Sequence, residues 1–284
     1  MSHAHKHHIR RSNLKTAIFL NLSFSVFEFI FGLIFNSKMI LADAIHDAGD
    51  AAVLISMFFV DFFSKKSPTK KFNYGFRRLS VIGAVVTSGL ILLGSYQLAR
   101  YVYYEFVNPH FSPYVNVPGL MAVSVVGVLV NFWSAKKLYG SKNLLDKAIF
   151  THMLEDLLGW IMAFLSSILI WVTGFHQIDR VMSLVILLMV AWSAIDVVVK
   201  SVKVLLNSAP SVKEFEKLEQ QILALEGVLE IENSHFWSLD GEQNVYTARI
   251  FIKKGAKIPD LRKEISKIVA NHGVVDSTIE FFEK

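Results

Sequence analysis

Two segments of the sequence carry a histidine followed four residues later by an aspartate. In "MILADAIHDAGDAAVLISMFF" the pair is His46 and Asp50, and in "THMLEDLLGW" it is His152 and Asp156. Residues four apart lie on one face of a helix, about 6 Å apart, so each segment would present an imidazole and a carboxylate side by side. Two such helices together offer two nitrogen and two oxygen ligands.

This combination of ligands has a chemical meaning. Four-coordinate binding by imidazole and carboxylate suits Zn²⁺ and, less selectively, Co²⁺ or Cd²⁺, whereas all-oxygen sites favour Mn²⁺, Mg²⁺ or Ca²⁺. The chain has no cysteine, which excludes thiolate sites and disulfides. The predicted metal ligands are therefore His46, Asp50, His152 and Asp156. One such pair on a soluble helix is commonly a surface pair, but two pairs in strongly apolar segments favour a metal site.

The elements that must position these residues are predicted to be membrane helices. Of the 284 residues, 53% are hydrophobic, and the charged residues are concentrated in a few short stretches. Mostly apolar runs of about 18 residues or more mark membrane spans. Six runs are predicted to be spans, at residues 14–35, 39–62, 79–103, 117–136, 149–173 and 179–206. Ionisable residues within such spans are costly and normally face a polar interior.

Basic residues are concentrated in alternate links between these spans. The N-terminus and the links after the second and fourth spans carry them, and the other three links are nearly bare of them. By the positive-inside rule both termini are predicted to be cytoplasmic. The net charge of +5 needs no nucleic-acid partner, because the basic residues lie where membrane topology places them. We therefore expect a multi-pass protein of a cell membrane, with the lipid bilayer as its surroundings.

The residues after the last span predict a small α+β domain. Its expected elements, in the order helix, strand, strand, helix and strand, are residues 212–226, 228–238 and 244–253, a helix that opens at Pro259, and residues 274–282. The stretch "LDGEQ" between the first two strands is a hairpin signal. Aromatic residues expected at the surface of this domain are Phe236, Trp237, Phe281 and Phe282.

The motifs resemble those of a known family. "NSKMILADAIHDAGDAAVL" and "THMLEDLLGW", with six spans and a cytoplasmic tail, are similar to the cation diffusion facilitator family of divalent-metal transporters, specifically its zinc-type members. Weaker marks agree with this, namely "YGFRRLSVIGA", "IDRVMSLVI", "VLLNSAP" and "HFWSL". The resemblance covers nearly the whole chain.

The resemblance implies a fold, a function and an organisation. It implies an α-helical polytopic membrane protein with six transmembrane helices and a C-terminal cytoplasmic ferredoxin-like (αββαβ) domain. The expected parts are a His-rich basic cytoplasmic leader (1–13), a six-span domain (14–207) and a cytoplasmic dimerisation domain (208–284). Such transporters move zinc, as substrate rather than cofactor, out of the cytoplasm in exchange for protons, and they act as homodimers. Residues 136–148 lack the His-rich insertion of eukaryotic relatives, which favours a bacterial plasma membrane.

Some positions depart from the family pattern. Ser80 stands where an acidic residue is usual, and the tail has Glu232 and Arg249 where relatives place histidines, so that only His235 remains. We therefore expect the tail to be a dimerisation scaffold rather than a metal sensor. The histidines of "MSHAHKHHIRR" fit either a metal-gathering arm or a flexible basic leader.

Other readings of function stay open at this point. One is a manganese- or iron-type transporter of the same family, and others are a membrane metalloenzyme and a metal sensor without transport. The chain has no His-Glu-x-x-His motif, and four protein ligands leave zinc no open catalytic position, so we expect no enzyme. The spans also contain polar residues that could handle metal or protons or could only pack helices, namely Asn21, Glu28, Asp43, Asp47 and Glu155.

Overall fold

The computed structural model describes residues 18–19, 22–63, 68–108, 114–138 and 144–284, without the side chains of residues 53–54, 56–63, 134, 137–138 and 144–153. The predicted leader, residues 1–13, and Asn21 lie outside this part of the chain. The chain divides into two compact units. The first comprises residues up to Ile55 together with Thr87–Ile195, and the second comprises Ser56–Val86 and Asp196–Lys284.

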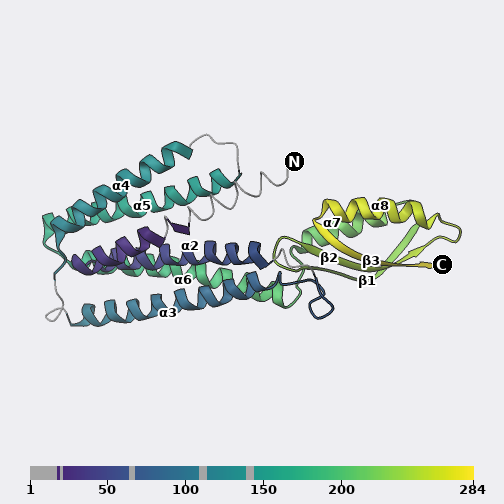
Figure 1. Ribbon diagram of the computed structural model, residues 1–284, viewed down its shortest axis with the longest axis horizontal. Coiled ribbons are helices and arrows are strands. Elements are labelled where there is room, and N and C mark those ends of the chain that lie inside the picture. Colours follow the sequence, from purple (N-terminus) through teal and green to yellow (C-terminus); the bar gives the residue numbers. More distant parts are fainter. Residues whose placement is uncertain (1–17, 20–21, 64–67, 109–113, 139–143) are drawn as a thin grey trace. The chain divides into compact units, whose positions relative to one another are not determined.

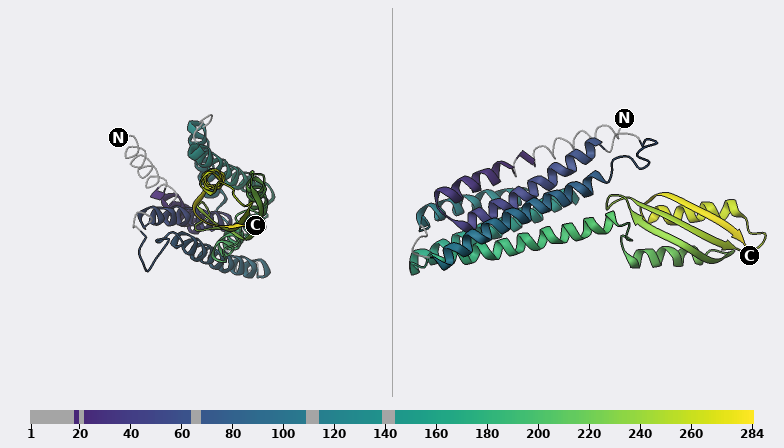
Figure 2. Two further views of the ribbon diagram at one scale, coloured as in Figure 1. Left: turned by 90° about the vertical axis from the view of Figure 1, so that its right-hand side faces the viewer. Right: turned by 90° about the horizontal axis from the view of Figure 1, so that it is seen from below.

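Long helices account for most of the described residues, as the apolar runs predict. A first helix, Leu22–Ile34, is followed by α2 (Lys38–Phe63), α3 (Leu79–Val107), α4 (Val117–Leu138), α5 (Leu144–Thr173) and α6 (Gln177–Leu205). Each helix coincides with one of the predicted spans. Figure 2 shows the helices of the first unit running alongside one another. The mostly helical architecture is therefore confirmed.

Within the described residues, three helices are long and apolar enough to cross a membrane. They are Leu79–Val107, Leu154–Thr173 and Gln177–Leu205, and the apolar stretches Leu22–Ile34 and Val117–Trp133 are shorter. Helix α2 has 26 residues and is on average as apolar as α4, but it carries three aspartates within "LADAIHDAGDAA". Aspartates are unusual in a membrane span, and they make α2 a candidate for a site.

Close packing of α4 on α5 depends on a glycine. The two helices lie side by side (Figure 1), and a Cβ added at Gly127 on α4 would come within 2.1 Å of the ring of Trp160 on α5. Trp160 is buried in an apolar cluster with Met39 and Ile40 of α2. Its ring also meets that of Phe24 edge-on, with centroids 6.0 Å apart. The ring of Trp160 thus packs against the first helix and α4, within a cluster that also contains residues of α2.

The second unit contains a three-stranded sheet covered on one face by two helices (Figure 1). Its elements are α7 (Val212–Leu223), β1 (Val228–Ser238), β2 (Asn244–Ile252), α8 (Ile258–Asn271) and β3 (Val274–Glu283). The central strand β2 pairs antiparallel with β1 and parallel with β3. The turn between β1 and β2 is fixed by Asp240, whose Oδ1 accepts hydrogen bonds from the backbone N–H groups of Glu242 and Gln243. The small C-terminal sheet and its element order agree with the sequence.

Alternation along β2 and helical periodicity in α7 and α8 build the core of this sheet. The buried residues are Tyr246, Ala248, Ile250 and Ile252 from β2, Leu218 and Ile222 from α7, and Leu261, Ile265 and Val269 from α8. Phe236 joins them and is only 4% exposed, so its expected surface position was wrong. The cause is a register shift between Glu232 and His235, which turns Phe236 to the face that Ile231 also occupies. Phe282 is 41% exposed, as predicted.

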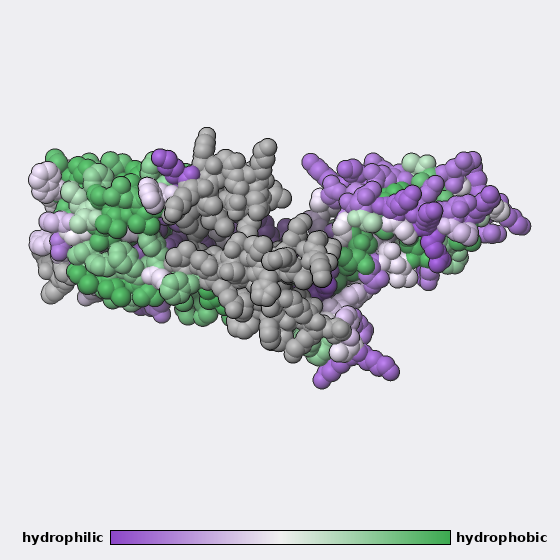
Figure 3. Space-filling model, turned by 45° about the horizontal axis from the view of Figure 1, so that its top comes forward, coloured by the Kyte–Doolittle hydropathy of each residue, from purple (hydrophilic) through white to green (hydrophobic). Residues whose placement is uncertain are grey.

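The two kinds of structure differ in their surfaces. In Figure 3, hydrophobic residues cover much of the helical part, whereas hydrophilic residues cover most of the part that contains the sheet. Large apolar side chains on α6, such as Leu188, Met189 and Trp192, point outward and are mostly exposed. Apolar surface of this extent is expected where lipid surrounds the helices.

Candidate metal site

Helices α2 and α5 bring potential metal ligands together. His46 and Asp47 of α2 and Asp156 of α5 each offer one ligand atom, and these atoms lie within 4.8 Å of one another. Asp47 and Asp156 are largely buried, while the His46 side chain is 32% exposed. Ligands of one zinc ion, each about 2.1 Å from the metal, lie roughly 3 to 4 Å apart. A small inward movement of these side chains would therefore suffice to bind one ion.

The other two predicted ligands lie on the same two helices. Asp50 is one turn after His46, with its Oδ2 3.9 Å from the Nε2 of His46 and its side chain 36% exposed. His152 belongs to α5, one turn before Asp156, but its side chain lies outside the described ones. The structure thus brings His46 and Asp156 together, keeps Asp50 beside His46 on α2, and adds Asp47 to the group. The helical spacing of the sequence predicts that Asp47 lies beside the helix face of His46 and Asp50 rather than on it.

Further carboxylates surround these ligands. Glu28 of the first helix is fully buried and faces Asp43, Asp47 and Asp156. The carboxyl group of Glu28 lies against that of Asp47, and its two oxygens have no other hydrogen-bond partner among the described residues. Ionised carboxylates gathered away from water repel one another unless protons or a cation compensate them. A divalent cation or protons bound among these carboxylates would relieve this repulsion.

Small residues and one backbone contact set the positions of these groups. A Cβ added at Gly159, one turn after Asp156, would lie 3.8 Å from the carboxylate oxygens of Asp43, so α2 and α5 approach closely there. The buried hydroxyl of Ser25 donates a 2.9 Å hydrogen bond to the carbonyl oxygen of Ala44. This bond fixes the first helix, and with it Glu28, against the part of α2 that carries the site.

A second cluster of buried charges was missed by sequence reasoning. Lys38, Glu105, Asp179 and Arg180 lie at the ends of α2, α3 and α6, and each is at most 6% exposed. Lys38 and Glu105 lie just outside the predicted spans. Charged residues are common there, so the sequence gives no reason to expect that these two are buried. The signal that could have found them is that all four lie at span ends predicted on the same side of the membrane.

The tail offers little for metal binding among its described residues. Arg249 pairs with Glu280 across the strands, with Nε and Oε2 3.0 Å apart. His272, which sequence reasoning did not consider, contacts Glu214 through Nδ1 at 2.9 Å and Gln221 through Nε2 at 3.0 Å. The group at His46, Asp47 and Asp156 is the only set of three potential ligands within such reach in the described part of the chain.

Comparison with known proteins identifies the family of the chain. Residues 14–206 match the family model of the cation efflux transmembrane domain. The zinc transporter ZitB of Yersinia pestis is 30% identical over 82% of this chain and 75% of its own length. A cadmium, cobalt and zinc/H(+)-K(+) antiporter of Bacillus subtilis is 24% identical over 99% of this chain and 91% of its own length. The metal cation efflux system protein CzcD of Cupriavidus metallidurans is 27% identical over 99% of this chain and 89% of its own length.

The chain belongs to the cation efflux family, because the family model covers most of its length. It is a multi-pass membrane transporter and not an enzyme. The resemblance that its motifs carry is confirmed, and the metalloenzyme reading is set aside.

Proposed function

We propose that the protein exports zinc from the cytoplasm, with Cd²⁺ and Co²⁺ as further substrates. The observation that carries this proposal is the convergence of His46, Asp47 and Asp156 within 4.8 Å on two apolar helices. An imidazole among carboxylates favours zinc over the harder Mn²⁺. The proposed ligands are His46, Asp50, His152 and Asp156, with Asp47 beside them. The similarity to the zinc transporter of Yersinia pestis and to the cadmium, cobalt and zinc antiporter of Bacillus subtilis supports the choice of metal.

Protons are proposed to drive the export. Zinc binds neutral imidazole and ionised carboxylate, so loading the site releases protons, and protons that arrive from the other side expel the metal. The ordinary pKa of histidine, about 6.5, suits a near-neutral cytoplasm and a more acidic exterior. The buried carboxylates around Glu28 would supply further groups that are compensated by a metal ion in one state and by protons in the other.

The proposed membrane arrangement has six spans and two cytoplasmic termini in a bacterial plasma membrane. The helices at all six predicted places and the basic links between them support it. We further propose a leader (1–13), a six-span domain (14–207) and a ferredoxin-like dimerisation domain (208–284), with a homodimer as the working form. The sheet order and the two helices on one face of the tail support the last of these parts.

Transport into inside-out vesicles tests the proposal. Vesicles that contain the full-length protein should accumulate zinc when their lumen is acidic, because the imidazoles must be protonated from that side. Accumulation should fade when the lumen is made alkaline or when an uncoupler collapses the gradient. The Asp196→Asn variant controls for the loss of a carboxylate outside the proposed site. Asp196 is exposed on α6 and pairs only with the nearby Lys200 among the described residues. Zinc accumulation that ignored both treatments would point to uniport or to another coupling ion.

A further inference from the structure

The cluster of Lys38, Glu105, Asp179 and Arg180 joins one end of α2 to α3 and α6, and we call it the charged cluster. Its two basic and two acidic residues balance in charge, and all four are buried. Charges buried away from water are costly unless they are paired, even at the ends of membrane spans. The charged cluster contains none of the proposed metal ligands. Its contacts instead connect three helices, α2, α3 and α6.

Glu105 is the centre of this cluster. Its Oε1 lies 3.4 Å from the Nζ of Lys38 on α2, and its Oε2 lies 3.3 Å from the Nε of Arg180 on α6. Arg180 also donates a 2.7 Å hydrogen bond from Nη1 to Gln177. One carboxylate on α3 therefore bridges cations of two other helices, and its removal would leave both without this partner.

Asp179 fixes the start of α2 to α6. Its Oδ2 accepts a 2.6 Å hydrogen bond from the backbone N–H of Lys38, and its Oδ1 accepts a 2.5 Å hydrogen bond from the hydroxyl of Ser37. The first N–H groups of a helix have no partners within the helix, and the helix dipole favours a negative charge there. The carboxylate of Asp179 therefore caps α2 from a neighbouring helix.

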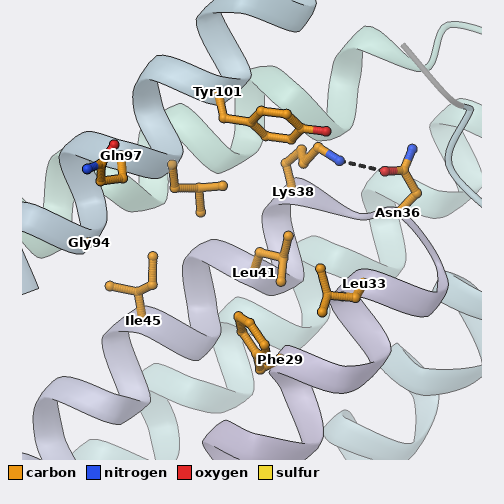
Figure 4. Close-up of a pocket in the computed structure, with 11 residues that line it drawn as sticks. Phe29, Leu33, Asn36, Lys38, Leu41, Ile45, Gly94, Gln97 and Tyr101 are labelled. Carbon is orange, nitrogen blue, oxygen red and sulfur yellow. Dashed lines mark hydrogen bonds between the residues drawn. The ribbon is translucent and has the colours of Figure 1, made fainter.

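A cavity lies beside the charged cluster (Figure 4). It has a volume of about 370 Å³ and lies between the first helix, α2 and α3, with Leu41, Ile45 and Gly94 among its lining residues. At one end Lys38 donates a 2.5 Å hydrogen bond to Asn36 and lies 5.0 Å from the ring centre of Tyr101. Apolar packing between α2 and α3 is incomplete at this cavity. Polar contacts must therefore supply much of the attachment between the two helices at that end.

We propose that Glu105 is a positioning residue of the transport cycle, which latches the start of α2 to α3 and α6 while the metal site is closed on that side. This inference rests on the proposed alternating transport of a metal ion. Residues at the latched end, including Val102, Met39 and Ile40, are almost fully buried, whereas the side chains of His46 and Asp50 are about one third exposed. The latched end is therefore less accessible in this structure than the proposed ligands are.

The latch has a physical reason to act as a switch. Separating Glu105 from Lys38 and Arg180 leaves buried charges unpaired unless water enters, so a half-open state is unfavourable. The cluster is then either closed and dry or open and hydrated. His46 follows Lys38 by about two helical turns, so a movement of the start of α2 is transmitted to the metal ligands through a continuous helix.

The first test measures access to the latched end without requiring transport. The chain has no native cysteine, so Val102→Cys in the full-length protein gives a single thiol one turn from Glu105. Adding Glu105→Gln should raise its rate of labelling by a membrane-impermeant maleimide roughly 5- to 30-fold, as expected from the loss of a coupled buried pair. Arg100→Gln, an exposed charge change on the same helix, is the control and should leave the rate unchanged. An unchanged rate with Glu105→Gln overturns the latch.

The second test holds the latch closed. Lys38→Cys with Glu105→Cys removes one charge of each sign, and a short reducible bis-thiosulfonate linker can then join α2 to α3. Zinc transport by the linked protein should fall at least tenfold and return on reduction, with zinc binding at equilibrium retained. For each single-cysteine variant, transport with the linker should equal that variant's own transport without it, because one thiol cannot join the two helices. A linked protein that transports zinc at the unlinked rate overturns the proposal, whereas a wild-type protein that moves no zinc overturns the proposed function instead.

Discussion

His46 and Asp156 lie on different helices, and their ligand atoms are within 4.8 Å of each other. The two residues belong to α2 and α5, which are separated in the chain by α3 and α4. Any movement of one helix relative to the other would therefore change the ligand geometry of a metal ion bound between them. This is the property that a transported cation requires of its site, because the same ligands must face first one side and then the other.

Each proposed ligand should be required for transport. Alanine at His46, Asp50, His152 or Asp156 should leave insertion into the membrane intact and lower zinc transport more than tenfold, since removal of even an outer-shell partner of a metal site typically costs 10- to 100-fold. Transport assays on vesicles with matched protein content measure this. An Asp156→Ala variant with nearly wild-type transport would contradict the assignment.

A comparison of two neighbouring carboxylates should separate ligand from surroundings. Asp50→Asn is expected to abolish zinc binding, whereas Asp47→Asn should retain binding and change the rate of transport. The reason is that Asp50 shares a helix face with His46, as an i, i+4 pair. Isothermal titration of the full-length detergent-solubilised variants with zinc checks this expectation. The reverse pattern would make Asp47 the ligand, as its distance to Asp156 allows.

The choice of metal should depend on His46. His46→Asp replaces a nitrogen ligand by oxygen, and the harder site is expected to shift transport toward Cd²⁺ or Mn²⁺ relative to zinc. Competitive uptake of paired metals measures the preference. If the preference did not change, these ligands would not set selectivity, and the manganese- or iron-type reading would have to be weighed again for the wild-type protein.

Two glycine substitutions should differ in their effects on stability. Gly127→Ala would push a methyl group into the ring of Trp160 and is expected to cost about 1 to 3 kcal/mol through overpacking. Gly89→Ala on α3 meets no atom within 4 Å and should be neutral or slightly stabilising, because alanine favours helix. Thermal unfolding of both variants in the same detergent compares them. Equal melting temperatures would mean that α4 and α5 can separate at little cost.

The tail should fold without metal. A fragment of residues 208–284 has a continuous core around Ile222, Ile250 and Ile265, and its described residues offer no group of three close ligands. At about 77 residues it is small for an independent core, and we expect it to self-associate. Sedimentation at several concentrations, with and without zinc, tests both statements. Dimerisation that required micromolar zinc would show the tail to be a metal sensor.

The sequence alone was enough to predict the family and the helices, and its spacing proposes a set of metal ligands. Spacing of four residues places His46 beside Asp50 because helical geometry is local, and the apolar runs predict helices for the same reason. The strands of the tail follow from alternation. Where a register shift interrupts the alternation, as before Phe236, the local pattern predicted the wrong face.

Only the tertiary structure decided which groups meet across helices. The packing of α2 against α5 brings Asp47 close to Asp156, and the packing of the first helix buries Glu28 beside both. The spacing of residues along the chain predicts neither contact. The contacts of Glu105 with Lys38 and Arg180 likewise join three helices that are distant in the chain. Such contacts depend on how whole helices pack, and packing is set by many side chains at once rather than by a motif.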